Sequence, residues 1–248
     1  MLRLETRDHI SHLVMNHGKV NVMDIEFCRE LIQHLEALEQ DSCRALILSG
    51  NERVFSAGVD LKRWLAEGED YVEPFLLELE RVMERMFVFP KPVIAVIQGH
   101  AVAGGCMMAA ACDYRLIAPQ ARIGIPELRV GVPLPMMAIE ILRFVANTSD
   151  FQNVVNVGRM FEGSEAVSAG LANEMVSADN LYERANQIAH EFSGIPQAAF
   201  RLTKQQSRAP VMRLVEQNRA EFYAEFLKIW RSPGTRESIQ AYVDERLA

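Results

Sequence analysis

Three glycines, Gly99, Gly104 and Gly105, separate an apolar run from an alanine-rich run in the segment VIAVIQGHAVAGGCMMAAAC, residues 93–112. A buried strand could turn into a helix at this point. The first turn of a helix leaves backbone N–H groups unpaired and carries partial positive charge, and glycine lets another group approach those amides closely. Such a helix start could bind a phosphate, a carboxylate or a developing enolate oxygen. Alternatively, the glycines simply allow a strand and a helix to pack closely.

The fingerprints of common phosphate and dinucleotide loops are missing from this segment. Gly99 and Gly104 match the outer glycines of GxxxxGK[ST], but Gly105 and Cys106 stand where the lysine and the hydroxyl are required. The segment has no GxGxxG, and the chain has no GxSxG nucleophile elbow. His100 has no suitably spaced acidic or cysteine partner and is interpreted as a polar residue at a strand end.

A single carboxylate in an apolar stretch is the second candidate for chemistry. Glu127 follows Pro126 within IGIPELRVG. Burial of a lone carboxyl raises its pKa, which suits proton transfer near neutral pH. The alternative is a loop carboxylate paired with Arg122 or Arg129. A further glycine-bearing turn, FSAGVDLKRW at residues 55–64, precedes a predicted helix.

The elements that position these residues follow a strand–helix alternation. Residues 2–8 and 9–15 alternate as paired strands, and residues 23–41 carry apolar residues at helical spacing with Asp24 as a candidate N-cap. Short apolar runs near residues 43–50 and 91–99 predict buried strands, each followed by a helical pattern. This order predicts an α/β fold with parallel strands. No internal repeat is visible in the sequence.

The chain is predicted to consist of a β/α core over residues 1–178 and a helical C-terminal region over residues 179–248. In the latter, Met212, Val215, Phe222, Phe226 and Ile229 fall near one face of a predicted helix. This stripe belongs either to the domain's own core or to a subunit interface.

Composition limits the class of ligand and the compartment. With 26 Lys and Arg against 33 Asp and Glu, the net charge of −7 argues against general affinity for nucleic acid or anionic membrane. The four cysteines form no CxxC and no zinc-ligand spacing with histidine, so no metal site is predicted. The N-terminus lacks a secretory pattern. We therefore expect a soluble, cytoplasmic protein.

Four ordered segments resemble the crotonase superfamily, also called the enoyl-CoA hydratase/isomerase family. They are ALILSGNERVFSAGVDL, KPVIAVIQGHAVAGGCMMAAACDYRLIA, ARIGIPELRVGVPLP and GRMFEGSEAVSAGLANEMV, and together they cover most of the chain. The resemblance implies a spiral ββα core with a helical C-terminal trimerisation region, and a homotrimer or homohexamer. It also implies an acyl-CoA thioester as substrate, with coenzyme A as part of that substrate and no separate cofactor.

The resemblance also assigns roles residue by residue. The N–H groups of Val59 and Gly104 match the two donors that hold the thioester oxygen as it becomes an enolate, and Glu127 matches a catalytic acid. The backbone near Ser56 and Ala57 is implied to meet the adenine, and Asp60, Leu61 and Lys62 to line the pantetheine and phosphate path. Lys62 or Arg63 would supply a cation, although for Arg63 a solvated helix face is the favoured interpretation.

One departure from the family pattern bears on the reaction. Family hydratases usually hold two glutamates that position water, and the first of these positions is Met107 here. Methionine can neither accept a proton nor orient water as a carboxylate does. One carboxylate is enough to move a proton from C2 to C4, so the pattern favours Δ3-to-Δ2 enoyl-CoA isomerisation with Glu127 as the sole acid/base.

The alternatives are a hydratase with an atypical single glutamate, a non-catalytic acyl-CoA-binding protein, and a crotonase-type hydrolase or decarboxylase. A second departure is the bulky apolar stretch VPLPMMAIE after Gly131, which leaves the preferred acyl chain length open.

Overall fold

Two larger β-sheets, a two-stranded sheet and the helices around them make up the molecule. In the computed structural model, which describes residues 1–246, the larger sheet has the strand order β1-β2-β4-β7-β9-β12 and the smaller one β11-β10-β8-β5, while β3 pairs only with β6. The strands are β1 (Leu2–Arg7), β2 (Ile10–Met15), β3 (Val22–Met23), β4 (Ala45–Ser49), β5 (Val54–Ser56), β6 (Gly58–Val59), β7 (Val93–Ile97), β8 (His100–Val102), β9 (Tyr114–Ile117), β10 (Arg122–Gly124), β11 (Phe161–Glu162) and β12 (Glu174–Met175).

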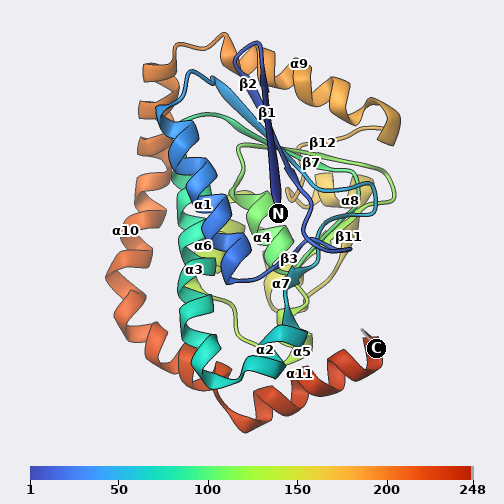
Figure 1. Ribbon diagram of the computed structural model, residues 1–248, viewed down its shortest axis with the longest axis vertical. Helices are drawn as coiled ribbons and strands as arrows, with labels where there is room; N and C mark the ends of the chain where they lie inside the picture. The colour runs from blue at the N-terminus through green and yellow to red at the C-terminus, as the bar shows by residue number, and fades with distance from the viewer. Residues whose placement is uncertain (247–248) are drawn as a thin grey trace.

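Helices surround the two sheets (Figure 1). They are α1 (Ile25–Gln40), α2 (Leu61–Glu67), α3 (Glu69–Val88), α4 (Gly104–Ala111), α5 (Glu127–Val130), α6 (Met136–Val145), α7 (Phe151–Val155), α8 (Gly163–Ser168), the short 3₁₀ turn η1 (Ala178–Asn180), α9 (Leu181–Ser193), α10 (Gln197–Trp230) and α11 (Pro233–Arg246). None of the helices within residues 1–246 is both long and apolar enough to cross a membrane.

The core repeats a ββα arrangement, which confirms the expected α/β class. The strand pairs β4/β5, β7/β8 and β9/β10 each contribute their first strand to the larger sheet and their second to the smaller one. In the larger sheet β2, β4, β7 and β9 run parallel, whereas β1 and β2 form an antiparallel hairpin. Every residue of β4 and β7 is buried, as expected for parallel strands covered on both faces.

Local sequence accounts for the first helix. The Asp24 carboxylate accepts a hydrogen bond of 2.8 Å from the Phe27 N–H, which confirms the predicted N-cap. The buried side chains of α1 recur every three or four residues and pack on the core: Ile25, Phe27, Cys28, Leu31, Ile32, Leu35 and Leu38. All four cysteines of the chain are buried and free.

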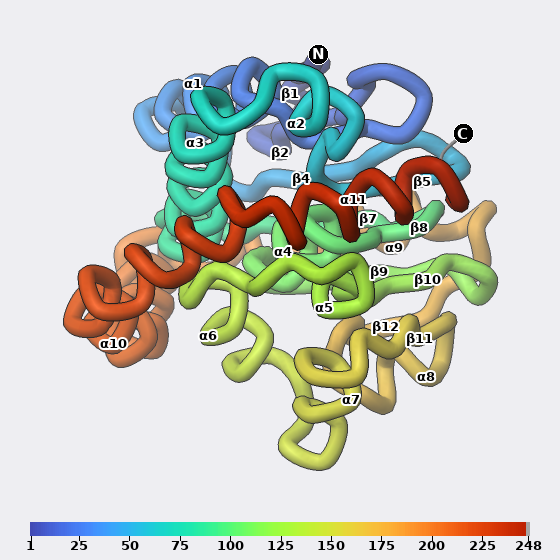
Figure 2. The backbone as a smooth tube through the Cα atoms, turned by 90° about the horizontal axis from the view of Figure 1, so that it is seen from below, coloured from blue at the N-terminus to red at the C-terminus, as the bar shows by residue number. Residues whose placement is uncertain are grey.

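The C-terminal helices α10 and α11 contact the core at two separate places. Along α10, buried Lys204 and Arg208 bind the Asp113 carboxylate at 2.6 and 2.7 Å, next to the start of β9. Beyond α10 the chain turns, and α11 contacts both α2 and α5. Figure 2 shows α11 crossing the molecule between these two short helices.

Three details differ from the sequence-based expectations. The segment of residues 51–64, whose sequence indicates a loop leading into a helix, contains the short strands β5 and β6; the segment of residues 121–131, whose sequence indicates extended and turn-rich chain, contains the four-residue helix α5 with Glu127. The predicted terminal helix is part of the 34-residue α10, and α11 follows it. Its apolar stripe is divided, because Val215 is buried whereas Phe222 is 53% exposed.

The predicted boundary at residues 178/179 falls within η1. The last two residues of the predicted C-terminal region lie outside the described residues.

Candidate active site

Two backbone N–H groups from separate elements lie side by side at the start of α4. A Cβ atom built on Gly58 would lie only 2.9 Å from the Gly104 nitrogen, and one built on Gly104 would lie 3.9 Å from the Val59 nitrogen. Gly58 also has φ +84°, a left-handed value that favours glycine. The absence of side chains at Gly58 and Gly104 therefore allows the Val59 and Gly104 amides to lie close together.

Both N–H groups point away from their own secondary structure. In the β3–β6 ladder, Met23 is the partner of Val59 and its carbonyl accepts from the Asp60 N–H at 3.1 Å. The alternation of a parallel ladder then turns the Val59 N–H away from β3. Gly104 is the first residue of α4, where an N–H has no partner within the helix.

Ala103 fixes the direction of the Gly104 amide. It adopts φ 56° and ψ −124°, a rare conformation for a residue with a side chain. Its own N–H donates to the Gly124 carbonyl at 2.9 Å, which ties the α4 start to the end of β10. Such strain is found where a site requires one backbone direction.

Glu127 follows β10 by three residues and lies at the first position of α5. Its residue surface is 8% exposed, and its Oε2 atom is buried without a hydrogen-bond partner. Burial raises its pKa from 4.5 to about 8. The pKa of the Cys106 thiol is raised chiefly by its burial and, to a smaller extent, by the negative charge of Glu127. The Glu127 carboxyl therefore lies near α4.

The proposed pairing of Glu127 with a neighbouring arginine is wrong. Arg122 binds Glu162 at 2.9 Å, and Arg129 donates to the Val157 carbonyl at 2.9 Å. Glu127 is thus a buried carboxyl without a cation, the state in which it can take up and return a proton near neutral pH.

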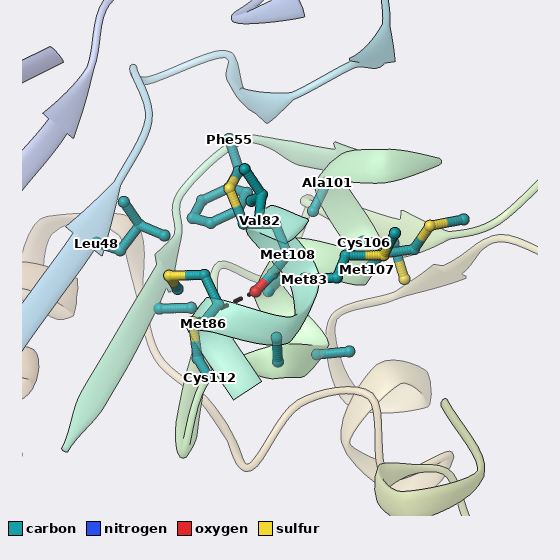
Figure 3. Packing of buried hydrophobic residues seen from close by; sticks show 14 of the residues in the cluster. Leu48, Phe55, Val82, Met83, Met86, Ala101, Cys106, Met107, Met108 and Cys112 are labelled. Carbon is teal, nitrogen blue, oxygen red and sulfur yellow. Dashed lines mark hydrogen bonds between the residues drawn. The ribbon is translucent and has the colours of Figure 1, made fainter. Parts of the chain in front are cut away.

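Met107 is buried one turn into α4, with its N–H donating to the Ala103 carbonyl at 3.1 Å. Figure 3 shows it within the apolar cluster around α4, together with Met83, Met86 and Met108. A buried thioether therefore occupies the position that the sequence analysis compared with a second glutamate.

The predicted coenzyme-binding residues follow one another along β5, β6 and the start of α2. Ser56 is 0% exposed, side chain and backbone together, so the implied adenine contact at this residue is not on the surface. Asp60 is the N-cap of α2, and its carboxylate accepts from the Arg63 N–H at 3.0 Å. Ala57 and Leu61 are partly buried, whereas the Lys62 side chain is exposed.

Arg63 is engaged within the protein. It forms ion pairs with Glu26, with Glu67 at 2.6 Å and with Asp24 at 3.5 Å, and it lies over the Tyr71 ring. The Arg63 side chain is thus neither a simple solvated group nor a free cation. Lys62 remains the candidate for a phosphate contact.

Sequence reasoning missed the segment of residues 21–23, which packs against the start of α4 and against β5. The Met23 sulfur lies 2.9 Å from the position of a Cβ on Gly104, and fully buried Asn21 donates to the Phe55 carbonyl at 3.1 Å. The only signal was the polar Asn21 between Val20 and Val22.

The bulky loop after Gly131 lines a cavity. A space of about 360 Å³ lies between α3, α6 and α10, with Leu134, Ile139 and Phe226 in its wall. Glu127 is not among the lining residues. Within residues 1–246, no group of three or more His, Cys, Asp or Glu side chains is placed to hold a metal ion.

Comparison with known proteins places this arrangement in a family. Residues 5–248 match the family model "Enoyl-CoA hydratase/isomerase". The chain is 28% identical over 250 residues to a probable enoyl-CoA hydratase of Rhizobium meliloti, covering 100% of this chain and 96% of the relative. It is 29% identical over 230 residues to human mitochondrial enoyl-CoA delta isomerase 1, covering 91% of this chain and 76% of that protein.

Solved structures show the same fold. The crystal structure of human mitochondrial Δ3-Δ2-enoyl-CoA isomerase superposes with a TM-score of 0.94 at 25% identity, covering 98% of this chain and 97% of that one. A probable enoyl-CoA hydratase of Mycobacterium tuberculosis gives 0.86 at 29% identity, with 91% and 95% covered. The paired amides, the buried carboxyl and these similarities lead to one conclusion: the chain is an enzyme of the enoyl-CoA hydratase/isomerase family, with the crotonase fold.

Proposed function

We propose that the protein is a Δ3-Δ2 enoyl-CoA isomerase that uses Glu127 as its sole acid/base. The observation that carries this proposal is the Glu127 carboxyl, buried and unpaired, in a site whose other acidic position is Met107. The relatives named above include both hydratases and isomerases, so the choice between the two reactions rests on these side chains.

The proposed reaction needs one base and one oxyanion site. Ionised Glu127 removes a proton from C2 of a 3-enoyl-CoA, and the electrons move onto the thioester oxygen to give a dienolate. The Val59 and Gly104 N–H groups donate to this oxygen, where preorganised donors are most effective because the negative charge forms there. Protonated Glu127 then returns the proton to C4, which leaves the double bond between C2 and C3.

Hydration requires a second group for proton transfer, and Met107 cannot supply it. Water must be oriented and deprotonated while a second proton is delivered to carbon, and a thioether is only a weak acceptor with no proton to give.

The test compares two glutamates of equal burial. Glu127→Gln should lower 3-enoyl-CoA isomerisation by about 10²–10⁴-fold, the usual contribution of a general base, while acyl-CoA binding is retained. Glu140→Gln is the matched control, since Glu140 is 7% exposed but is paired with Arg143 on α6. Near-normal turnover by Glu127→Gln would refute the assignment, and acyl-CoA binding without turnover by the wild type would favour a non-catalytic binder.

A hydratase is the second candidate, supported by the family's hydratase members. Hydration of crotonyl-CoA by the wild type at about 10³ s⁻¹, the upper end of typical enzyme rates, would favour it. The variant Met107→Glu supplies the missing carboxylate. A gain of hydration in this variant would show that position 107 limits the reaction.

We further propose that coenzyme A binds along residues 56–62, with Lys62 near a phosphate, and that the protein forms a homotrimer or homohexamer through its C-terminal helices. Exposed apolar side chains on α10, among them Leu202 and Phe222, support an interface there. Sedimentation equilibrium tests the assembly, and a monomer at micromolar concentration would contradict it.

A further inference from the structure

We propose that Ser56 is a positioning residue that holds the Val59 and Gly104 N–H groups at the spacing an enolate oxygen requires. The inference rests on the oxyanion site of the proposed function. It assigns to the Ser56 side chain a role distinct from the backbone contact with coenzyme A that the family resemblance suggests for this position.

The Ser56 hydroxyl joins two segments beneath the first donor. It donates to the Asn21 carbonyl at 2.7 Å and accepts from the Gly58 N–H at 3.1 Å. Asn21 begins the segment that continues into β3, and Gly58 directly precedes Val59 on β6. One hydroxyl therefore fixes the distance between β3 and β6, the two strands whose pairing directs the Val59 N–H.

Ser56 also supports the second donor. A Cβ on Gly105 would lie 2.3 Å from the Ser56 carbonyl oxygen and 2.8 Å from the Ser56 Cβ, so the first turn of α4 lies directly on this residue. In the smaller sheet, Ser56 pairs with Ala101 of β8, the strand that leads into Gly104. Ser56 thus contacts the chain on both sides of the amide pair.

These contacts demand a residue that is both small and polar. Ser56 is 0% exposed, so its hydroxyl cannot reach a substrate. A larger side chain would press against the α4 backbone. An apolar one would leave the Asn21 carbonyl and the Gly58 N–H without this partner in a buried place, where unpaired polar groups are costly. The close contact between Gly105 and Ser56 therefore requires both residues to be small.

The test separates positioning from general stability. Ser56→Ala should lower kcat about 10- to 100-fold, less than or near the effect of losing one oxyanion donor outright, with KM changed less than about threefold because the coenzyme contacts remain. Ser56→Cys keeps the packing but weakens both hydrogen bonds, so it should give an intermediate kcat. This nearly isosteric variant also tests the proposal if Ser56→Ala does not fold.

A spectroscopic measurement follows the thioester itself. Infrared difference spectra of isotope-labelled butanoyl-CoA report how strongly the donors polarise its carbonyl. Wild-type protein should lower the carbonyl frequency, and Ser56→Ala should lose at least half of that shift. The control is Ser11→Ala on β2, which removes another fully buried serine hydroxyl, bonded to Thr6 at 2.9 Å and remote from the site; it should retain the whole shift.

Each result decides the proposal. A full carbonyl shift and kcat within threefold of wild type in Ser56→Ala would overturn it, as would an equal loss in Ser11→Ala. Lack of a shift in wild-type protein would instead refute the oxyanion site, and the Ser56 role with it. Because the spectrum needs no turnover, a shift in a wild type that lacks isomerase activity would refute the proposed reaction alone.

Discussion

Replacing Glu127 by glutamine should change how the stability of the protein depends on pH. Burial raises the pKa of this carboxyl from 4.5 to about 8, so the fold favours its protonated form. Below pH 4.5 the group is protonated in both the folded and the unfolded chain. As the pH rises from 4.5 towards 8, the unfolded chain releases the proton while the folded chain retains it, and the free energy of unfolding decreases.

The size of this effect follows from linkage. One pH unit of difference in pKa corresponds to about 1.36 kcal/mol, so the rise from 4.5 to about 8 corresponds to a loss of roughly 5 kcal/mol by pH 9. Glutamine cannot ionise and does not show this loss. Its amide adds a pH-independent cost of about 1–3 kcal/mol if its N–H groups stay unpaired.

The assay is urea unfolding of the wild type and Glu127→Gln at half-unit steps from pH 4.5 to 9. The free-energy difference between the two proteins should move by several kcal/mol in favour of the variant across this range, because the other ionisable groups cancel in the comparison. A difference that stays flat with pH would show that Glu127 is solvated or paired, and would refute the assignment of a buried free carboxyl.

Three further predictions concern activity and the C-terminal helix. If ionised Glu127 is the base, kcat/KM should rise about tenfold per pH unit up to pH 8 and then level off; a plateau already reached at pH 6 would contradict this. Lys62→Ala should raise KM for acyl-CoA about two- to fivefold, and less so at high salt, because the side chain is exposed; an unchanged KM at low salt would remove Lys62 from the phosphate site. Gly131→Ala should loosen α11, because its Cβ would lie 2.9 Å from the Ser238 Cβ at φ +88°, whereas Gly68→Ala at φ +78° meets nothing within 4 Å. Hydrogen exchange of α11 compares the two, and equal protection would contradict the clash.

Local patterns predicted the regular elements, because their burial is periodic in the sequence. The Asp24 cap and the apolar face of α1 were readable in this way, and so were the uniformly buried strands β4 and β7. The strands β5 and β6 span only three and two residues. Such short pieces show no period, and only pairing with β8 and β3 makes them strands.

The ββα repetition of the core was implied by the family resemblance, but the local sequence patterns do not show it. The repeated units share buried positions rather than residue types, so the fold repeats where the sequence does not. The length of α10 was hidden for another reason. Pro210 lies inside it, and proline usually breaks a helix. In the tertiary structure, the anchors Lys204 and Arg208 lie in the turns just before this proline.

The family resemblance assigns residues to the site, but it does not say how they are held. The proposed roles of Val59 and Gly104 depend on backbone directions set by Gly58 and Ala103, which no side-chain pattern records. The Ser56 hydroxyl was likewise unreadable, because its partners are a backbone carbonyl and a backbone N–H.

The isolation of Glu127 is the point at which structure adds most to the sequence. Two arginines lie within five residues of it, and proximity in sequence alone would favour an ion pair. The pairing of β10 with β11 places Arg122 opposite Glu162, and Arg129 on α5 donates to the Val157 carbonyl instead. An ionised carboxyl left without a cation destabilises the fold by several kcal/mol, so stability gives no reason for an acid there. Proton transfer does, because a base that ionises near pH 8 can both remove a proton from carbon and return it.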